Sequence, residues 1–352
     1  MRGSNMAKWA LTGLVLVFFC VVADLAAATT YADTFVNVQA NHTVAVTFGM
    51  KGDLNNDGRI DVQDVILCLR MAVGLDKKDL VHGDMNSDGD IDVADVIVIL
   101  SKVVQGDVPS GMVVIPAGEF LMGSPAGEGY DEEHPQHKVY VDAFFMDTYE
   151  VTNSQYAKFL NDYGKNTDDA GQQMIYENAW GVRKVGGKWE PQPGYENHPV
   201  VYVTWYGAAQ YAKFYGKRLP TEAEWEKACR AGSTGKWCFG DDESQLGEYA
   251  WYSVNSGGTT HPVGGKKANA YGLYDMHGNV WEWCADWYGG AYYASSPYQN
   301  PQGPVSGEYR VLRGGSWYGS AVGCRSAYRS RADPASWIDD VLGFRCAVSG
   351  TQ

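Results

Sequence analysis

The feature that most restricts the fold of this chain is an internal repeat in its N-terminal third. Residues 52–69 (GDLNNDGRIDVQDVILCL) match residues 83–100 (GDMNSDGDIDVADVIVIL) at an offset of 31 residues. Each copy has oxygen-bearing residues at loop positions 1, 3, 5, 9 and 12, and glycine at position 6, where a calcium loop turns sharply. The expected ligands are Asp53, Asn55, Asp57, Asp61, Asp64 and the Arg59 carbonyl in the first copy, and Asp84, Asn86, Asp88, Asp92, Asp95 and the Asp90 carbonyl in the second. The repeat therefore predicts two Ca²⁺ sites, each followed by an apolar helix.

Neither loop is preceded by the helix that normally enters an EF-hand. Residues 43–48 alternate like a strand, and residues 77–82 are too few for a helix. Such a pair of half EF-hands resembles a dockerin, over about residues 50–106. The resemblance implies a small all-α module and a cohesin-like partner. Positions 10 and 11 of the loops lack the Ser/Thr pairs that many cohesin-binding dockerins carry, so a calcium-bound spacer without a partner is the alternative.

Residues 1–28 have the pattern of a signal peptide. A positively charged start precedes an apolar stretch at 9–22, and three alanines at 26–28 offer small residues for cleavage. We expect an exported protein, secreted, on the cell surface or periplasmic, with no transmembrane segment after cleavage; an uncleaved anchor is the alternative. Residues 29–49 are expected to form a short strand or hairpin segment.

Charge and cysteine content narrow the class of protein further. The net charge of −14 argues against a nucleic-acid partner, because phosphates require clustered Lys and Arg. One of the seven cysteines lies in the signal peptide. In an oxidising compartment the others can form disulfides. Cys229–Cys238 and Cys284–Cys324 are plausible pairs, although the spacing does not determine the connectivity.

The chain after residue 106 is expected to form a linker (107–111) and one further domain (112–350). The sequence predicts a strand, turn and strand at 112–124, and helices that begin after Thr152, Thr204 and Thr221. The last 120 residues or so are rich in Gly, Trp and Tyr and show few helical periods, which indicates long loops on a small sheet. No HExxH metal motif or nucleophile elbow occurs.

Four motifs of this domain occur in an order that resembles the formylglycine-generating enzyme, or sulfatase-modifying-factor, family. They are GKRLPTEAEWE (216–226), YGLYDMHGNVWEW (271–283), RVLRGGSW (310–317) and GFRCA (343–347). The resemblance covers about residues 111–349 and implies an α+β, C-type-lectin-like fold. It also implies a calcium site formed by the side chains of Asp275 and Glu282 and the carbonyls of Gly278 and Val280.

The copper site of that family departs from its pattern in this sequence. The family places two cysteines five residues apart after Arg-Gly-Gly-Ser, where this chain has Gly319 and Cys324. Soft Cu(I) is held by paired sulfurs, so we expect neither copper nor oxidase activity. Cys324 is the catalytic candidate only if a formylglycine-generating or related metal-dependent oxidase reaction is retained, which is one alternative.

The segment 318–340 is the candidate ligand-binding surface for a protein or a glycan. Its composition of Tyr, Trp, Ser, Gly and Asp is typical of paratopes, in which rigid rings give contact area and small polar residues adapt. The candidate contact residues are Tyr318, Ser320, Val322, Tyr328, Ser330, Ser336, Trp337, Ile338, Asp339 and Asp340. Residues 324–327, Arg329, Arg331 and Pro334 are interpreted as framework. This arrangement resembles the variable proteins of diversity-generating retroelements. A dockerin-tethered component of a polysaccharide-degrading assembly is a further alternative.

Overall fold

The computed structural model describes residues 53–54, 62–72, 90–91, 95, 99, 108–336 and 339–350. The chain divides into two compact units, residues 1–99 and 100–352. The predicted signal peptide and the segment 29–49 lie outside the described residues, as do Trp337, Ile338 and most of the two calcium loops. Within the described part of the chain, no helix is long and apolar enough to span a membrane.

The first unit contains helix α1 (Val62–Ala72), which follows the first copy of the repeat. One side of α1 buries Cys68 and Met71. The loop closes on the start of this helix, because the amide of Leu54 donates to the Asp64 carboxylate at 2.7 Å. Asp53, Asp64 and Asp95 are all nearly inaccessible to solvent.

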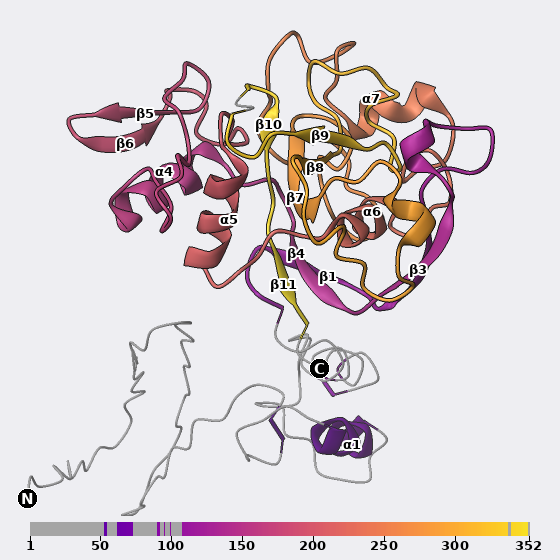
Figure 1. The fold of residues 1–352 in the computed structure, drawn as a ribbon. Helices are drawn as coiled ribbons and strands as arrows, with labels where there is room; N and C mark the ends of the chain where they lie inside the picture. The colour runs from indigo at the N-terminus through magenta and orange to yellow at the C-terminus, as the bar shows by residue number, and fades with distance from the viewer. Residues whose placement is uncertain are drawn as a thin grey trace, which may run out of the picture. The chain divides into compact units, whose positions relative to one another are not determined.

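The second unit is a mixed α+β domain, whose described residues form four small sheets (Figure 1). A four-stranded sheet runs in the order β10 (Leu342–Gly343), β7 (Trp281–Trp287), β8 (Arg310–Arg313) and β9 (Ser330–Ala332). A three-stranded antiparallel sheet has the order β1 (Met112–Ile115), β4 (Phe144–Asp147) and β11 (Ala347–Ser349). The antiparallel pairs β2 (Gly118–Met122) with β3 (His137–Val141) and β5 (Val182–Val185) with β6 (Lys188–Pro191) complete it.

The helices begin where the sequence predicts. Helices α4 (Asn153–Tyr163) and α6 (Glu222–Arg230) start with capping boxes at Thr152 and Thr221. Helix α5 (Trp205–Phe214) starts at Thr204, whose hydroxyl accepts from the Gly207 amide. The remaining short elements are α7 (Leu246–Tyr249) and the 3-10 turns η1 (Asp131–Glu133), η2 (Glu243–Gln245) and η3 (Tyr292–Ser295).

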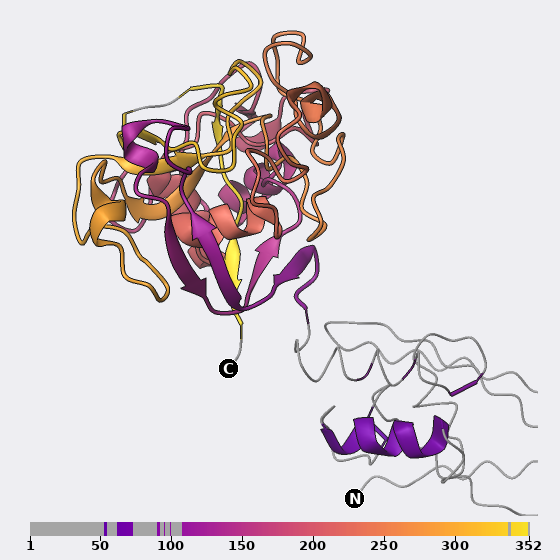
Figure 2. The ribbon, with the colours of Figure 1, turned by 90° about the vertical axis from the view of Figure 1, so that its right-hand side faces the viewer.

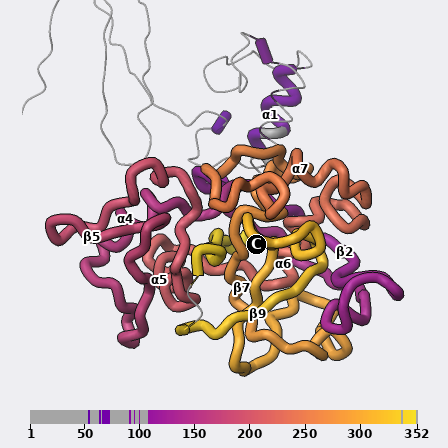
Figure 3. The backbone as a smooth tube through the Cα atoms, turned by 90° about the horizontal axis from the view of Figure 1, so that it is seen from above, coloured from indigo at the N-terminus to yellow at the C-terminus, as the bar shows by residue number. Residues whose placement is uncertain are grey.

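Two cores lie on opposite sides of β7. Figure 3 shows α4, α5 and β5 on one side of this strand and α6 and β2 on the other. On the first side Tyr156, Tyr211 and Phe344 pack together, whereas on the second side Trp225 of α6 packs among residues of the three-stranded sheet. The loops after β8 and β9 gather at the end of the domain away from the C-terminus (Figures 1 and 2).

Candidate ligand-binding surface

The loop after β8 alternates buried framework with exposed contact positions. The Tyr318 side chain is 74% exposed and Val322 is 42% exposed, and Ser320 is also exposed. Trp317, Ala321 and Cys324 between and beside them are buried. The same backbone segment therefore presents some side chains to solvent and packs the others into the domain.

Two glycines and three backbone hydrogen bonds hold this loop in place. Gly314 and Gly315 have φ of 97° and 81°, and a Cβ on Gly315 would lie 2.8 Å from the Cys324 sulfur. Non-glycine residues rarely adopt this backbone region. The amide of Trp317 donates to the Asn279 carbonyl, the amide of Gly278 to the Gly314 carbonyl, and the amide of Ser253 to the Gly319 carbonyl.

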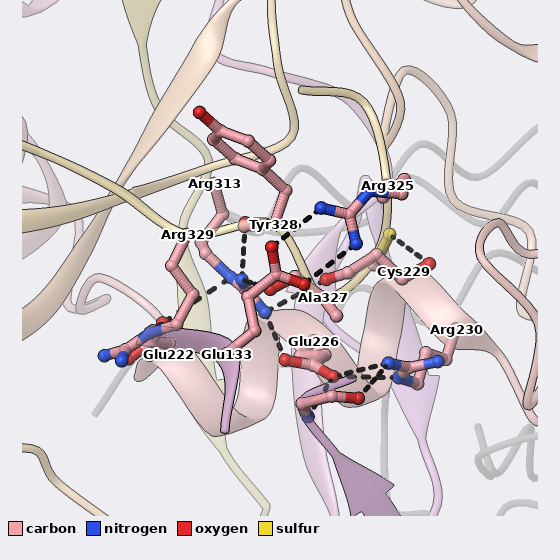
Figure 4. A network of polar contacts seen from close by, with 12 residues as sticks. Glu133, Glu222, Glu226, Cys229, Arg230, Arg313, Arg325, Ala327, Tyr328 and Arg329 are labelled. Atoms are coloured by element: carbon pink, nitrogen blue, oxygen red, sulfur yellow. Dashed lines mark hydrogen bonds and ion pairs between the residues drawn. The ribbon is translucent and has the colours of Figure 1, made fainter. Parts of the chain in front are cut away.

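Arg313 fastens the next part of the loop from beneath (Figure 4). Its fully buried guanidinium donates to the carbonyls of Ala327 (2.9 Å), Tyr328 (2.5 Å) and Ser326 (3.0 Å), and it pairs with Glu226 of α6. Three consecutive carbonyls are thus satisfied by one side chain that also carries an ion pair. This arrangement positions the Tyr328 ring at the surface without involving the ring itself.

Arg325 and Arg329 anchor the same segment in two different elements. Arg325 pairs with Glu133 of η1 through two hydrogen bonds of 2.7 and 2.8 Å, and Arg329 pairs with Glu222 of α6 at 2.6 and 2.8 Å. Burial by itself would raise the pKa values of Glu133 and Glu222. Arg325 nevertheless holds the pKa of Glu133 below its usual range, and Arg329 does the same for Glu222. The framework role expected for residues 324–327, Arg329 and Pro334 agrees with their burial, whereas Arg331 is exposed.

The second part of the surface is the turn after β9. Ser330 is half-buried on β9, and Ser336 is exposed in a turn capped by Asp333. Asp339 and Asp340 are half-buried side by side. Burial and the neighbouring Asp339 raise the pKa of Asp340 to about 6.

Two aromatic residues at this surface were not found by sequence reasoning. Trp180, in the loop before β5, packs edge-on against Trp317 at 5.6 Å. Tyr202 donates its amide to the Asp339 carbonyl at 3.1 Å and has φ of 60°, which is unusual for a bulky residue. Both lie more than a hundred residues before the loop they contact, so no local sequence pattern could connect them to it.

The cysteines correct one expectation from the sequence. In the described part of the second unit, Cys229, Cys238, Cys284, Cys324 and Cys346 are all free thiols. The expected pairs Cys229–Cys238 and Cys284–Cys324 are therefore not formed in this structure. Cys284 belongs to β7 and packs in the core beneath α6, whereas Cys324 packs with Trp237 and Leu246. Compartment chemistry suggested pairing, but the fold places these two sulfurs in different clusters.

Cys324 has none of the properties of a reactive thiol. It is fully buried, and burial raises its pKa to about 12. Gly319 closes a turn, because its amide N–H donates a hydrogen bond to the Ser316 carbonyl, and it supplies no sulfur. A nucleophilic or metal-binding cysteine acts as the thiolate, which this environment disfavours.

The predicted calcium turn is a cluster of buried carboxylates around Arg345. Glu282 gives both oxygens to Arg345 at 2.7–2.9 Å and also accepts from the Trp225 indole. Asp275 accepts from the Gly264 amide and keeps one buried oxygen without a partner.

A further buried carboxylate, Glu150, lies beside Asp275. Burial and the nearby Asp275 raise the pKa of Glu150 well above its usual range. Among the described residues, no three His, Cys, Asp or Glu side chains are arranged as a metal site. Calcium here, with the Gly278 and Val280 carbonyls, stays a prediction.

Comparison with known proteins places the second unit in a family. Residues 101–349 match the sulfatase-modifying factor enzyme 1-like domain. A serine/threonine-protein kinase, pkn1, of Chlamydia caviae is 44% identical over 67% of this chain, and this chain spans only 37% of that relative's length. A formylglycine-generating enzyme of Streptomyces coelicolor is 38% identical, covering 67% of this chain and 88% of the enzyme. Among solved structures, Treponema denticola variable protein 1 is 30% identical with a TM-score of 0.54, covering 70% of this chain and 98% of that one. With four motifs, the α+β fold and most of the chain in agreement, the chain belongs to the sulfatase-modifying factor enzyme 1-like domain family.

Proposed function

We propose that this chain is an exported binding protein whose sulfatase-modifying-factor domain contacts a ligand through residues 318–340, without oxidase activity. The N-terminal repeat, in this proposal, is a calcium-bound, dockerin-like module that tethers the domain to a partner or surface. The ligand is a protein or a glycan outside the chain.

One observation carries the binding proposal: along the loop after β8, buried residues hold the backbone in place and exposed residues face solvent. The buried residues of this segment are held by ion pairs and main-chain bonds, which do not depend on the exposed side chains. The exposed residues are Tyr318, Ser320 and Val322. A rigid backbone lowers the entropy cost of binding, and the exposed positions tolerate replacement because they support no core.

Two further facts favour binding over oxidation. The copper site of the family needs two cysteines, and this chain has Gly319 in place of the first. The remaining Cys324 is buried, which raises its pKa. The name of the similar Treponema denticola variable protein motivates the idea that residues of this surface are diversified, as exposed contact residues of a binding surface can be.

The test is to sequence codons 310–347 across the source population, together with the flanking DNA. We expect the codons of the exposed positions 318, 320, 322, 335 and 336 to vary, while those of 313–317 and 324–327 stay constant. If a diversity-generating retroelement acts on this segment, a near-copy that is rich in AAC codons should lie in the flanking DNA. Variation spread evenly over buried and exposed positions would contradict a binding surface, and uniform codons without a near-copy would contradict diversification.

A further inference from the structure

The proposed surface combines aromatic rings with a pair of acidic side chains. Trp180 packs on Trp317 at 5.6 Å, and Trp317 packs on the exposed Tyr318 at 5.5 Å. The Trp317 indole donates to the Asp340 carbonyl at 2.9 Å. Asp339 and Asp340 therefore lie next to these rings, and we call this group of five residues the acidic aromatic surface.

The opposite border of the acidic aromatic surface is also aromatic. Tyr202 donates its amide to the Asp339 carbonyl at 3.1 Å. Trp281 donates its amide to the carbonyl of Val341, the residue after Asp340, and its ring lies 5.7 Å from that of Tyr328. Main-chain hydrogen bonds thus hold residues 339–341 against Tyr202 and Trp281. Burial and the nearby Asp340 and Asp339 raise the pKa of Tyr202, so its half-buried phenol lies close to both carboxylates.

No cation of the described residues forms an ion pair with Asp339 or Asp340. Of the arginines in the preceding segment, Arg325 and Arg329 pair with buried glutamates, and Arg331 lies over the rings of Tyr288 and Tyr309. The hydrogen bonds of the two side chains are local: the Asp340 amide donates to the Asp339 carboxylate at 2.8 Å, and the two carboxyl groups also bond to each other. Half-buried negative charge without a compensating cation costs free energy, and a cationic ligand group would recover it.

We propose that the ligand is a polypeptide that presents an arginine side chain, with its guanidinium between the Asp339 and Asp340 carboxylates and its plane against the exposed rings. This inference rests on the proposed function of the 318–340 surface. Arginine fits better than lysine because its planar fork can bond two carboxylates while it stacks on an aromatic face.

The experiment uses the full chain and two fluorescently labelled peptides, Gly-Arg-Gly-Arg-Gly and its citrulline counterpart. Citrulline keeps the shape of arginine and lacks the charge. Fluorescence anisotropy should show binding of the arginine peptide and at least about tenfold weaker binding of the citrulline peptide, because the paired charges are lost.

The matched variants separate a specific site from general attraction to an acidic protein. D339N/D340N removes two charges from the surface, and E243Q/E308Q removes two charges at exposed positions elsewhere. The first should weaken arginine-peptide binding at least about tenfold, and the second by less than about twofold. Equal losses in both variants would overturn the proposal.

A measurement on the unaltered protein covers the case in which D339N/D340N folds poorly. The titratable groups that act on Asp340 are Asp339 and, across the turn, the Tyr202 phenol. Because the pKa of Asp340 is about 6, arginine-peptide binding should strengthen as pH rises from 5 to 7. Binding that is independent of pH would contradict the assignment.

Three other outcomes also count against the proposal. Equal binding of both peptides would mean stacking alone, and no binding of either would exclude an arginine ligand. Displacement of the peptide by Ca²⁺ in the unaltered protein, but not in D339N/D340N, would make the carboxylates a metal site. In each of these cases, codons that vary at the exposed positions would still support the proposed binding function. Failure of the arginine proposal can therefore be told apart from failure of the proposed function.

Discussion

At the scale of a single residue, Asp286 shows how burial couples stability to pH. This carboxylate on β7 is fully buried and accepts from the Glu222 amide at the start of α6 (2.8 Å). Burial and the charge of Glu222 raise its pKa to about 8 from an ordinary value of 3.8. The folded state therefore binds the proton more tightly than the unfolded chain. The resulting stability is complete below about pH 4 and is lost as pH rises through about 8.

D286N should remove this pH dependence, because the amide is neutral and its oxygen can still accept from the Glu222 amide. Relative to the unaltered protein, we expect the variant to gain on the order of 4 kcal/mol between pH 5 and pH 8, at about 1.36 kcal/mol for each pH unit between the two pKa values. Urea unfolding at both pH values measures the difference, with the exposed substitution E243Q as control. A constant difference between D286N and the unaltered protein would show that Asp286 is ionised throughout.

At the scale of an element, the segment 325–329 depends on buried ion pairs with α6 and η1. Its role is to carry Tyr328 and to support the loop before it. A buried pair is costly to break on one side, because the remaining charge is left without compensation. The charges that hold the segment are therefore more important for stability than the exposed residues are.

R329M should cost about 3–5 kcal/mol, because Glu222 loses its bidentate partner in the core. The neighbouring substitution R331M should cost no more than about 1 kcal/mol, since Arg331 is exposed, lies over the rings of Tyr288 and Tyr309 and forms no buried ion pair. Chemical denaturation of both variants tests the comparison. Similar losses for the two arginines would show that burial of the ion pair does not decide the outcome.

At the scale of the whole molecule, thiol reactivity and Cu(I) binding both depend on whether the cysteines can act as thiolates. The native protein should react with less than about one equivalent of a thiol reagent, because only Cys238 among the described cysteines is partly accessible and burial raises its pKa to about 12. It should also fail to retain Cu(I) against a chelator, because it lacks a pair of thiolates.

The controls are the unfolded protein and G319C. Unfolding should expose all the cysteines, and a mass deficit of two hydrogens would instead reveal a disulfide. G319C restores a second cysteine five residues before Cys324, so it is the comparison for Cu(I) retention. Tight retention of Cu(I) by the unaltered chain, with oxygen uptake in the presence of a cysteine peptide, would contradict the proposed function.

Much of the domain's local structure could be predicted from the sequence. Thr152, Thr204 and Thr221 start helices in the structure because a hydroxyl that accepts from an amide in the first turn is a purely local interaction. The strands β1 and β2 also follow from local alternation, and the four ordered motifs correctly indicated the family and its α+β fold.

The sequence by itself thus determined the helix starts, the family and the absence of one sulfur at Gly319, because each depends on residue type at a fixed spacing. Only the tertiary structure decided which residues share a surface. It brought Trp180 and Tyr202 to the loop after β8, separated Cys284 from Cys324, and paired Arg325 and Arg329 with glutamates far away in the chain. Contacts between distant segments arise from packing and long-range hydrogen bonds, and the order of residues along the chain does not encode them locally.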